Sequence, residues 1–337
     1  MQQVKPEATG LSPVARGSGR IVWIDALRGL AIVAMATYHF GWDLQYFGYI
    51  AAPAVDVGGW KLLARIDASS FLFLVGVGLV LAHGPGIRWR SFAKRLAMIL
   101  AGAAAITVVT YFMTPETFIF FGILHSIALS SVIGLAFLRL PAVATLVVAC
   151  VVLVVPFFDS SSLFDVAPLW FVGLSRHLPP SNDYVPLLPW LAPVLAGIAG
   201  ARLGLRYGVF TWLRERAPAR NIRPTRWLAL AGRHSLGVYL LHQPILFGLV
   251  FLASQTVPPS TSGVEESYLS SCRTQCTASR GEAFCTRFCG CTLDELNGRH
   301  LFRDVTEGRI DTSRDERVLT LARQCTRRAD ASPSDPR

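Results

Sequence analysis

The segment Ile21–Leu44 carries four ionisable side chains whose spacing places them on one side of a helix. At about 100° per residue, Asp25, Arg28, His39 and Asp43 fall within an arc of roughly 60°. A charge near the centre of a bilayer costs at least ~2.5–3.5 kcal/mol, so this face must point toward the protein interior or water. His39 lies about 21 Å from Asp25 at helical rise. The stripe therefore predicts a protein that moves or transfers a group across a membrane.

The two ends of this stripe suggest different chemistry. His39 and Asp43 are four residues apart near the outer end, and a carboxylate beside an imidazole fixes its tautomer and raises its basicity. We therefore predict that both are catalytic residues. Asp25 and Arg28 are three residues apart at the inner end. They are predicted either to form an ion pair that sets the depth of the helix or to bind a polar ligand.

Further candidate residues lie in later segments. His125, within FIFFGILHSIALSS, is a third candidate catalytic residue. Asn182 and Asp183, within SNDYVPLLPW, are predicted either to cap a helix or to bind a polar acceptor at the outer mouth. The last apolar segment adds five substrate-binding candidates, although its first two would also suit an ordinary helix end: Arg233, His234, Tyr239, His242 and Gln243.

The composition predicts an all-α, polytopic transmembrane helical bundle. The chain has 337 residues, of which 52% are hydrophobic and only 16% charged, with a mean hydropathy of +0.43. In soluble domains, typically about a quarter of the residues are charged.

No cleavable signal peptide is evident, and the first predicted span is interpreted as a signal anchor. We predict about seven spans, at residues 21–44, 66–83, 92–113, 117–138, 141–158, 187–205 and 227–254. The apolar stretch 163–175 is too short to span.

The basic residues follow the expected pattern of a membrane topology. With the N-terminus inside, the predicted inner segments hold fifteen Lys and Arg residues and the short outer loops hold three. The positive-inside rule then places the N-terminus in the cytoplasm, and seven spans place the C-terminus outside. The net charge of +10 is explained by this asymmetry, so the expected partner is the lipid bilayer and not nucleic acid.

The chain divides into a cytosolic polar lead (1–20), a transmembrane bundle (21–254) and an extracytoplasmic Cys-rich tail (255–337) that begins at the linker SQTVPPSTSG. Two CxxxC pairs in the tail suit two short antiparallel helices stapled by two disulfides, because residues four apart share a helix face. A four-cysteine zinc site is the alternative. The disulfide candidates, of which the last two would form a third bridge, are Cys272, Cys276, Cys285, Cys289, Cys291 and Cys325.

Five blocks of the bundle resemble a known family when taken together and in order. They are IDALRGLAIVAMATYHFGWDL, SSFLFLVGVGLVLAHG, FIFFGILHSIALSS, NDYVPLLPW and GRHSLGVYLLHQP. The set resembles the bacterial branch of the heparan-alpha-glucosaminide N-acetyltransferase catalytic-domain family over roughly residues 20–250. Asp25 and Arg28 match the family's D-x-x-R-G motif. The sequence shows no nucleotide-binding glycine motif and no metal-binding constellation in the bundle, so no metal is expected.

The resemblance implies an acyltransferase of the bacterial inner membrane, with its tail in the periplasm. Such an enzyme takes an acetyl group from cytosolic acetyl-CoA and passes it to an amino sugar or other glycan acceptor outside. The lysosomal member of the family carries its catalytic histidine after the first span, but this chain has no histidine between Phe40 and Ala82. Either His39 has taken over that role or the chemistry differs. Direct transfer and a transiently acetylated histidine both fit.

Two other classes of protein remain open at this stage. A proton-coupled transporter would also use an intramembrane Asp/His relay, although many transporters contain repeats that this chain lacks. A membrane-anchored protein that displays the tail would explain the cysteines but not the buried charges. The sequence does not decide whether copies of the chain form a homo-oligomer.

Overall fold

A computed structural model describes residues 21–50, 54–84, 86–158, 160–177, 179–216, 223–259, 261–277, 279–306 and 309–331. All regular structure in these ranges is helical, which confirms the predicted all-α class. The predicted polar lead, residues 1–20, lies outside the described residues.

The described part of the bundle contains nine α-helices. They are α1 (Val22–Tyr46), α2 (Gly58–His83), α3 (Trp89–Met113), α4 (Ile123–Phe137), α5 (Ala142–Phe158), α6 (Leu187–Arg206), α7 (Val209–Glu215), α8 (Arg223–Arg233) and α9 (Ser235–Thr256). Four of them, α2, α3, α6 and α9, are long and apolar enough to cross a membrane. The apolar helices α4 and α5 are shorter, at 15 and 17 residues. α1 has 25 residues, but its polar stripe lowers its hydropathy.

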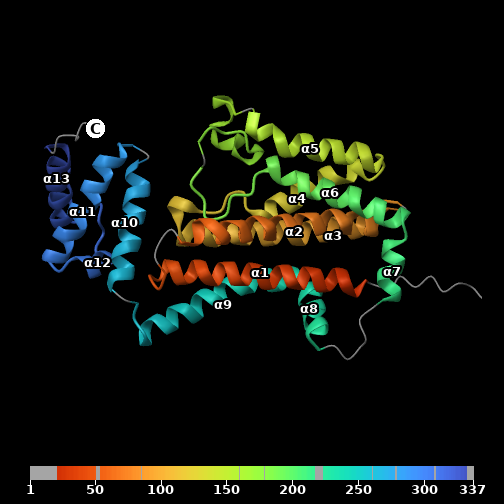
Figure 1. The fold of residues 1–337 in the computed structure, drawn as a ribbon, viewed down its shortest axis with the longest axis horizontal. Coiled ribbons are helices and arrows are strands. Elements are labelled where there is room, and N and C mark those ends of the chain that lie inside the picture. The colour runs from red at the N-terminus through yellow and green to blue at the C-terminus, as the bar shows by residue number, and fades with distance from the viewer. Residues whose placement is uncertain are drawn as a thin grey trace, which may run out of the picture.

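The bundle helices form two groups (Figure 1). In the larger group, α6 packs against α2, α4 and α5, and α3 covers α4. Its core is a continuous apolar cluster that includes Leu72, Leu195 and Ile198, all fully buried. In the smaller group, α8 and α9 pack against α1, and α1 joins the two groups through its contact with α2.

Glycines allow the closest helix contacts in both groups. Where α1 meets α8, a Cβ on Gly29 would clash with the Leu228 carbonyl, and one on Gly232 would clash with the Asp25 carbonyl. The contact of α2 with α6 follows the same rule, because a Cβ on Gly76 or Gly197 would strike the backbone of the other helix. Small residues let membrane helices approach until their backbones touch. The glycine of the D-x-x-R-G motif is therefore a packing residue.

The last predicted span, 227–254, is not one helix. α8 ends at Arg233 and α9 begins at Ser235, and α8 runs across α1 while α9 runs alongside it (Figure 1). The reason is the close contact at Gly232, which fixes α8 against α1 before the chain turns. The apolar stretch 163–175 forms no long helix; two short 3-10 helices, Ser162–Phe164 and Ala167–Val172, cover part of it. Cys150 is exposed on α5.

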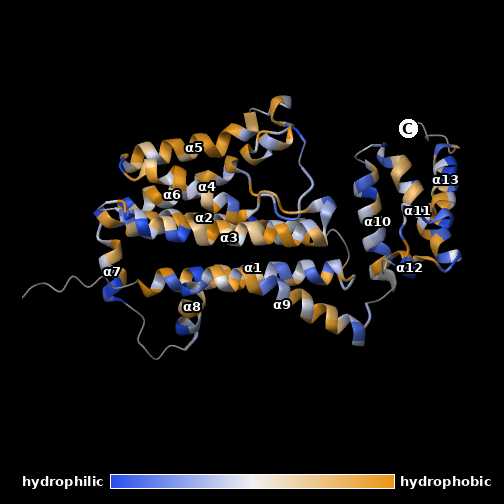
Figure 2. Cartoon of the chain, turned by 180° about the vertical axis from the view of Figure 1, so that it is seen from behind, coloured by the Kyte–Doolittle hydropathy of each residue, from blue (hydrophilic) through white to orange (hydrophobic). Residues whose placement is uncertain are grey.

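The C-terminal region folds into four helices, namely α10 (Thr261–Thr277), α11 (Glu282–Gly298), α12 (Phe302–Thr306) and α13 (Glu316–Ala331). Three disulfides join α10, α11 and α13, which confirms the predicted use of the six cysteines. The pairs are Cys272–Cys289, Cys276–Cys285 and Cys291–Cys325. These helices carry more polar residues than the bundle (Figure 2), and they enclose a small core of their own.

The two glycines of α6 that face Phe73 provide a matched test of this packing. A Cβ on Gly197 would overlap the Phe73 carbonyl, whereas one on Gly200 would lie 3.5 Å from the Phe73 ring, an ordinary contact. We expect Gly197→Ala to destabilise the protein by about 1–3 kcal/mol because the helices must separate. Gly200→Ala should be neutral or slightly stabilising. Thermal unfolding of the purified protein in detergent measures both, and equal midpoints would contradict the close contact.

Candidate functional site

The N-terminal end of α1 contributes a partly buried ion pair, and the arginine of this pair lies near a second arginine. Asp25 is buried, and its Oδ1 lies 3.4 Å from Arg28 Nη1. The Arg28 guanidinium also lies beside Gly78 of α2, and the guanidinium of Arg95 from α3 approaches the same glycine. We call Arg28 and Arg95 the inner arginine pair. Two guanidinium groups at one point favour an anionic ligand such as a phosphate.

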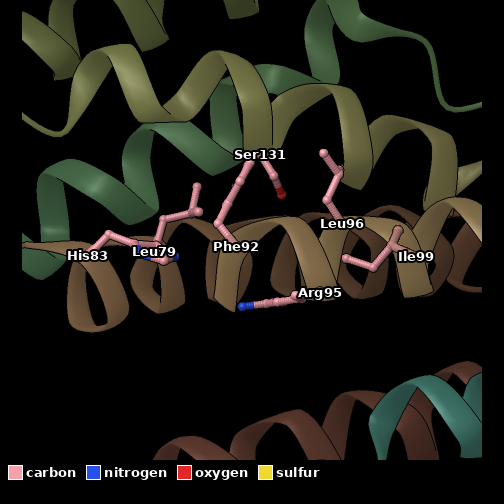
Figure 3. A pocket seen from close by; sticks show the side chains of 7 residues that line it. All are labelled: Leu79, His83, Phe92, Arg95, Leu96, Ile99 and Ser131. Atoms are coloured by element: carbon pink, nitrogen blue, oxygen red, sulfur yellow. The ribbon is translucent and has the colours of Figure 1, made fainter. Parts of the chain in front are cut away.

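Arg95 also lines a small pocket between α2, α3 and α4. Figure 3 shows Arg95 on the edge of α3 and Ser131 reaching down from α4. His83, buried at the end of α2, lines the same pocket, and its Nδ1 accepts a hydrogen bond from the Arg88 backbone at 3.2 Å. The end of the bundle at which α1 begins is therefore basic where α1, α2 and α3 meet.

The C-terminal half of α1 meets α9 through two histidines. The ring centroids of His39 and His242 lie 5.0 Å apart, with the rings edge to face. His242 Nδ1 lies 2.6 Å from the Tyr239 carbonyl oxygen. Since a carbonyl can only accept, Nδ1 carries the proton of the neutral ring. Nε2 then presents a lone pair, and this atom is buried without a hydrogen-bond partner.

Asp43 and Gln243 lie next to these histidines and add further acceptors. The Gln243 amide nitrogen donates to Asp43 Oδ1 at 2.7 Å, so its oxygen points elsewhere. Asp43 Oδ2 and Gln243 Oε1 are both buried without partners. We call His39, Asp43, His242 and Gln243 the histidine cluster. Its three buried atoms without a partner are all acceptors, so it suits a ligand rich in N–H or O–H donors.

The expected pairing of His39 with Asp43 is replaced by another contact. Helical spacing places both side chains on the same face, as predicted, but Asp43 is hydrogen-bonded to Gln243 and its other oxygen has no partner. The amide from α9 occupies the position that the imidazole was predicted to take. His39 packs instead against the His242 ring. The imidazole with a fixed tautomer in this cluster is therefore that of His242.

Asp67 of α2 is a further candidate functional residue, which the sequence patterns above did not single out. It is buried, and its Oδ1 has no partner. Tyr239, one turn before His242, lies within electrostatic range of the carboxylates of both Asp67 and Asp183. The available signal was a single acid at the start of the apolar run DASSFLFLVGVGLVL, because an intramembrane carboxylate is a functional candidate by default.

His125 belongs to a helix cap. Its Nδ1 accepts from the Gly122 backbone N–H at 3.2 Å, and its Nε2 lies 3.4 Å from the Thr107 hydroxyl. That hydroxyl donates to the Ile119 carbonyl at 2.7 Å, so it accepts from His125. Both ring nitrogens are therefore occupied, and this arrangement favours a structural role over proton transfer.

Asn182 and Asp183 hold the loop before α6 against the end of α3 and the start of α4. Asp183 Oδ2 accepts from the Ile123 backbone N–H at 2.9 Å, and the Asn182 amide donates to the Thr114 hydroxyl at 3.1 Å. Of the two roles predicted for these residues, helix capping agrees with the contact that Asp183 makes. The helix that it caps is α4, however, and not the adjacent α6. Arg233 and His234 are exposed at the junction of α8 and α9, away from the histidine cluster.

The described residues contain no group of three or more His, Cys, Asp or Glu side chains placed to hold a metal ion. On α1, polar side chains gather at two places, a basic N-terminal end and an acceptor-rich C-terminal half. Apolar spans around such an interior define an integral membrane protein.

A comparison with known protein families identifies the family to which the chain belongs. The profile described as "Heparan-alpha-glucosaminide N-acetyltransferase, catalytic" matches residues 20–244, and the chain belongs to this family. It is therefore a membrane acetyltransferase by family. Comparisons with curated proteins and with solved structures gave no significant match.

The Asp183 cap predicts a pH dependence of stability. Burial raises the pKa of Asp183 from 3.8 to about 6, against the opposing effect of the Ile123 N–H. A carboxyl whose folded pKa is raised stabilises the fold while protonated, so stability should fall as the pH rises through about 4–6 and then level off. The loss is at most about 3 kcal/mol.

Asp183→Asn keeps an oxygen acceptor for Ile123 but cannot ionise. We expect its thermal midpoint in detergent to change less than that of the wild type between pH 4.5 and 7. Identical pH profiles for the two proteins would show that Asp183 does not titrate in this range.

Proposed function

We propose that this protein transfers an acetyl group from cytosolic acetyl-CoA to an amino sugar or other glycan acceptor on the outer side of the membrane. The observation that carries this proposal is the Nε2 lone pair of His242. It is buried, unpartnered and held in one tautomer by the Tyr239 carbonyl, within the matched catalytic domain. A general base or nucleophile needs these properties.

The inner arginine pair is suited to hold the donor. Coenzyme A carries several phosphates, and guanidinium groups bind phosphate oxygens with charge-assisted hydrogen bonds. Arg28 lies about 16 Å below His39 at helical rise. The extended pantetheine arm of coenzyme A would cover this distance and bring the thioester to the histidine cluster.

The reaction then needs one base and one leaving group. His242 Nε2 removes a proton from the acceptor amine or hydroxyl, which attacks the thioester carbonyl. The C–S bond breaks, and the same proton passes from the imidazole to the departing thiolate, giving free coenzyme A. In the two-step alternative, Nε2 itself takes the acetyl group, and the acceptor then displaces it. Both routes use the same lone pair.

The other members of the cluster serve the acceptor. Asp43 Oδ2 and Gln243 Oε1 are acceptors without donors, and an amino sugar offers both N–H and O–H groups. His39 packs against the His242 ring and would position it. This assignment moves the central role from His39, favoured by the sequence, to His242.

The reaction implies a defined orientation. The N-terminus would lie in the cytoplasm, and the disulfide-linked C-terminal region would lie in the periplasm of a bacterial inner membrane. The distribution of basic residues supports this orientation, and the three disulfides suit an oxidising compartment.

The central test measures transfer of labelled acetyl groups from acetyl-CoA to glycans in membranes containing the protein. We expect His242→Ala to lower the rate about 10²–10⁴-fold, because it removes the base. His39→Ala should cost less, since the Nε2 lone pair remains.

His177→Ala serves as the control, because His177 is exposed in the loop before α6, where it contacts Asp165. Transfer that persists in His242→Ala at the wild-type rate would exclude His242 as base or nucleophile. An absence of transfer in every protein, including the wild type, would contradict the acetyltransferase assignment and favour a transporter.

The donor site has its own test. Arg95→Gln should raise the KM for acetyl-CoA about 10-fold or more with a smaller change in kcat, because a charge-assisted hydrogen bond contributes about 1.5–3 kcal/mol. Arg90→Gln, an exposed arginine on the same helix, is the matched control. Equal KM values for the two variants would show that Arg95 does not bind the donor.

A further inference from the structure

The C-terminal region contains a groove that the bundle chemistry does not involve. α10 and α13 both pack on α11, and neither packs closely against the other. The space between them is a cavity of about 480 Å³, a volume typical of small-molecule sites. Phe288, Thr292 and Leu296 of α11 form its floor at four-residue spacing.

The lining of this groove carries no charge. The side chains around it are apolar or uncharged, with Tyr268 on α10 and Val318 and Leu321 on α13 forming the walls. The Tyr268 hydroxyl is already hydrogen-bonded to Thr292 at 3.0 Å. The polar residues Ser271, Gln275 and Thr312 are exposed at the edges. An ionic ligand would find no counter-ion in the groove, so its ligand is neutral and apolar.

The disulfides hold the groove open. Cys272–Cys289 and Cys276–Cys285 fix α10 to α11, and Cys291–Cys325 fixes α13 to the opposite side of α11. The two walls are therefore attached covalently to the floor and cannot close by sliding together. A rigid, uncharged groove is preorganised for a ligand.

The length of the groove suits part of an extended hydrocarbon chain. Its floor from Phe288 to Leu296 is about 12 Å long at helical rise, and the lining is apolar or uncharged along that length.

α10, which forms one wall of the groove, begins beside the end of a membrane span. α9 ends at Thr256 and α10 begins at Thr261. The Tyr49 hydroxyl donates to the Val257 carbonyl, and Val264 of α10 packs on Gly48 at the end of α1. Figure 1 shows the C-terminal helices beside the ends of α1 and α9. The apolar molecules available at that position are membrane lipids.

We propose that the groove between α10 and α13 binds one acyl chain of a membrane lipid, with the lipid headgroup left at the exposed polar edge. This site is separate from the histidine cluster and does not depend on the acetyltransferase assignment.

Photolabelling of the full-length protein in lipid nanodiscs tests this proposal. The probe is a phosphatidylcholine with a diazirine in one acyl chain, and labelled peptides are identified by mass spectrometry. We expect labels on groove residues of α10, α11 and α13. Ala322→Trp fills the groove and should reduce this labelling at least 10-fold, whereas Thr320→Trp, at an exposed position on the same helix, should leave it unchanged.

Intact mass under non-reducing conditions verifies the three disulfides in each variant, and Val318→Trp provides a second way to fill the groove if Ala322→Trp loses them. Equal groove labelling in the filled variants and the wild type would overturn the proposal. An unlabelled groove in the wild type would do the same. Labelling only by a free diazirine fatty acid would exclude a membrane lipid as the source. Crosslinks between two C-terminal regions in place of lipid labels would identify a second copy as the occupant.

Discussion

A helix with two acids, an arginine and a histidine on one face can stay in a membrane only if other helices cover that face. α1 is covered by α2 on one side and by α8 and α9 on the other. The close approach at Gly29 and Gly232 is part of this cover. The two helix groups of the bundle meet along the polar face of α1, so the packing of the bundle and the position of the candidate site have a common cause.

Different side chains surround the two ends of α1, and this gives the two ends different chemical properties. At the N-terminal end, Asp25 pairs with Arg28, and a second arginine lies nearby. Farther along, the three buried atoms of the histidine cluster that lack a hydrogen-bond partner are all acceptors. One end therefore favours an anion, and the other favours a group with hydrogens to donate. These are the properties of a donor nucleotide and of an amine or hydroxyl acceptor.

The sequence predicted what depends on local spacing. The shared face of Asp25 and Asp43, the helical cysteine pairs and the family blocks all follow from residues a few positions apart. The partners of those residues could not be read from periodicity. Gln243 reaches Asp43 across 200 positions, and Asp183 caps α4 across 60. The break between α8 and α9 was also missed, because the contact at Gly232 that turns the chain depends on the backbone of a distant helix.

The hydrogen bond between Asp43 and Gln243 also bears on how the protein is made. Two hundred residues separate the two partners. At about 5–20 residues per second, the ribosome needs roughly 10–40 s to synthesise the intervening chain. During that interval α1 must remain in or near the membrane without α8 and α9, which later cover part of it. Asp25 and Arg28 can neutralise each other within α1 as soon as it forms, but Asp43 must wait for the last helix of the bundle.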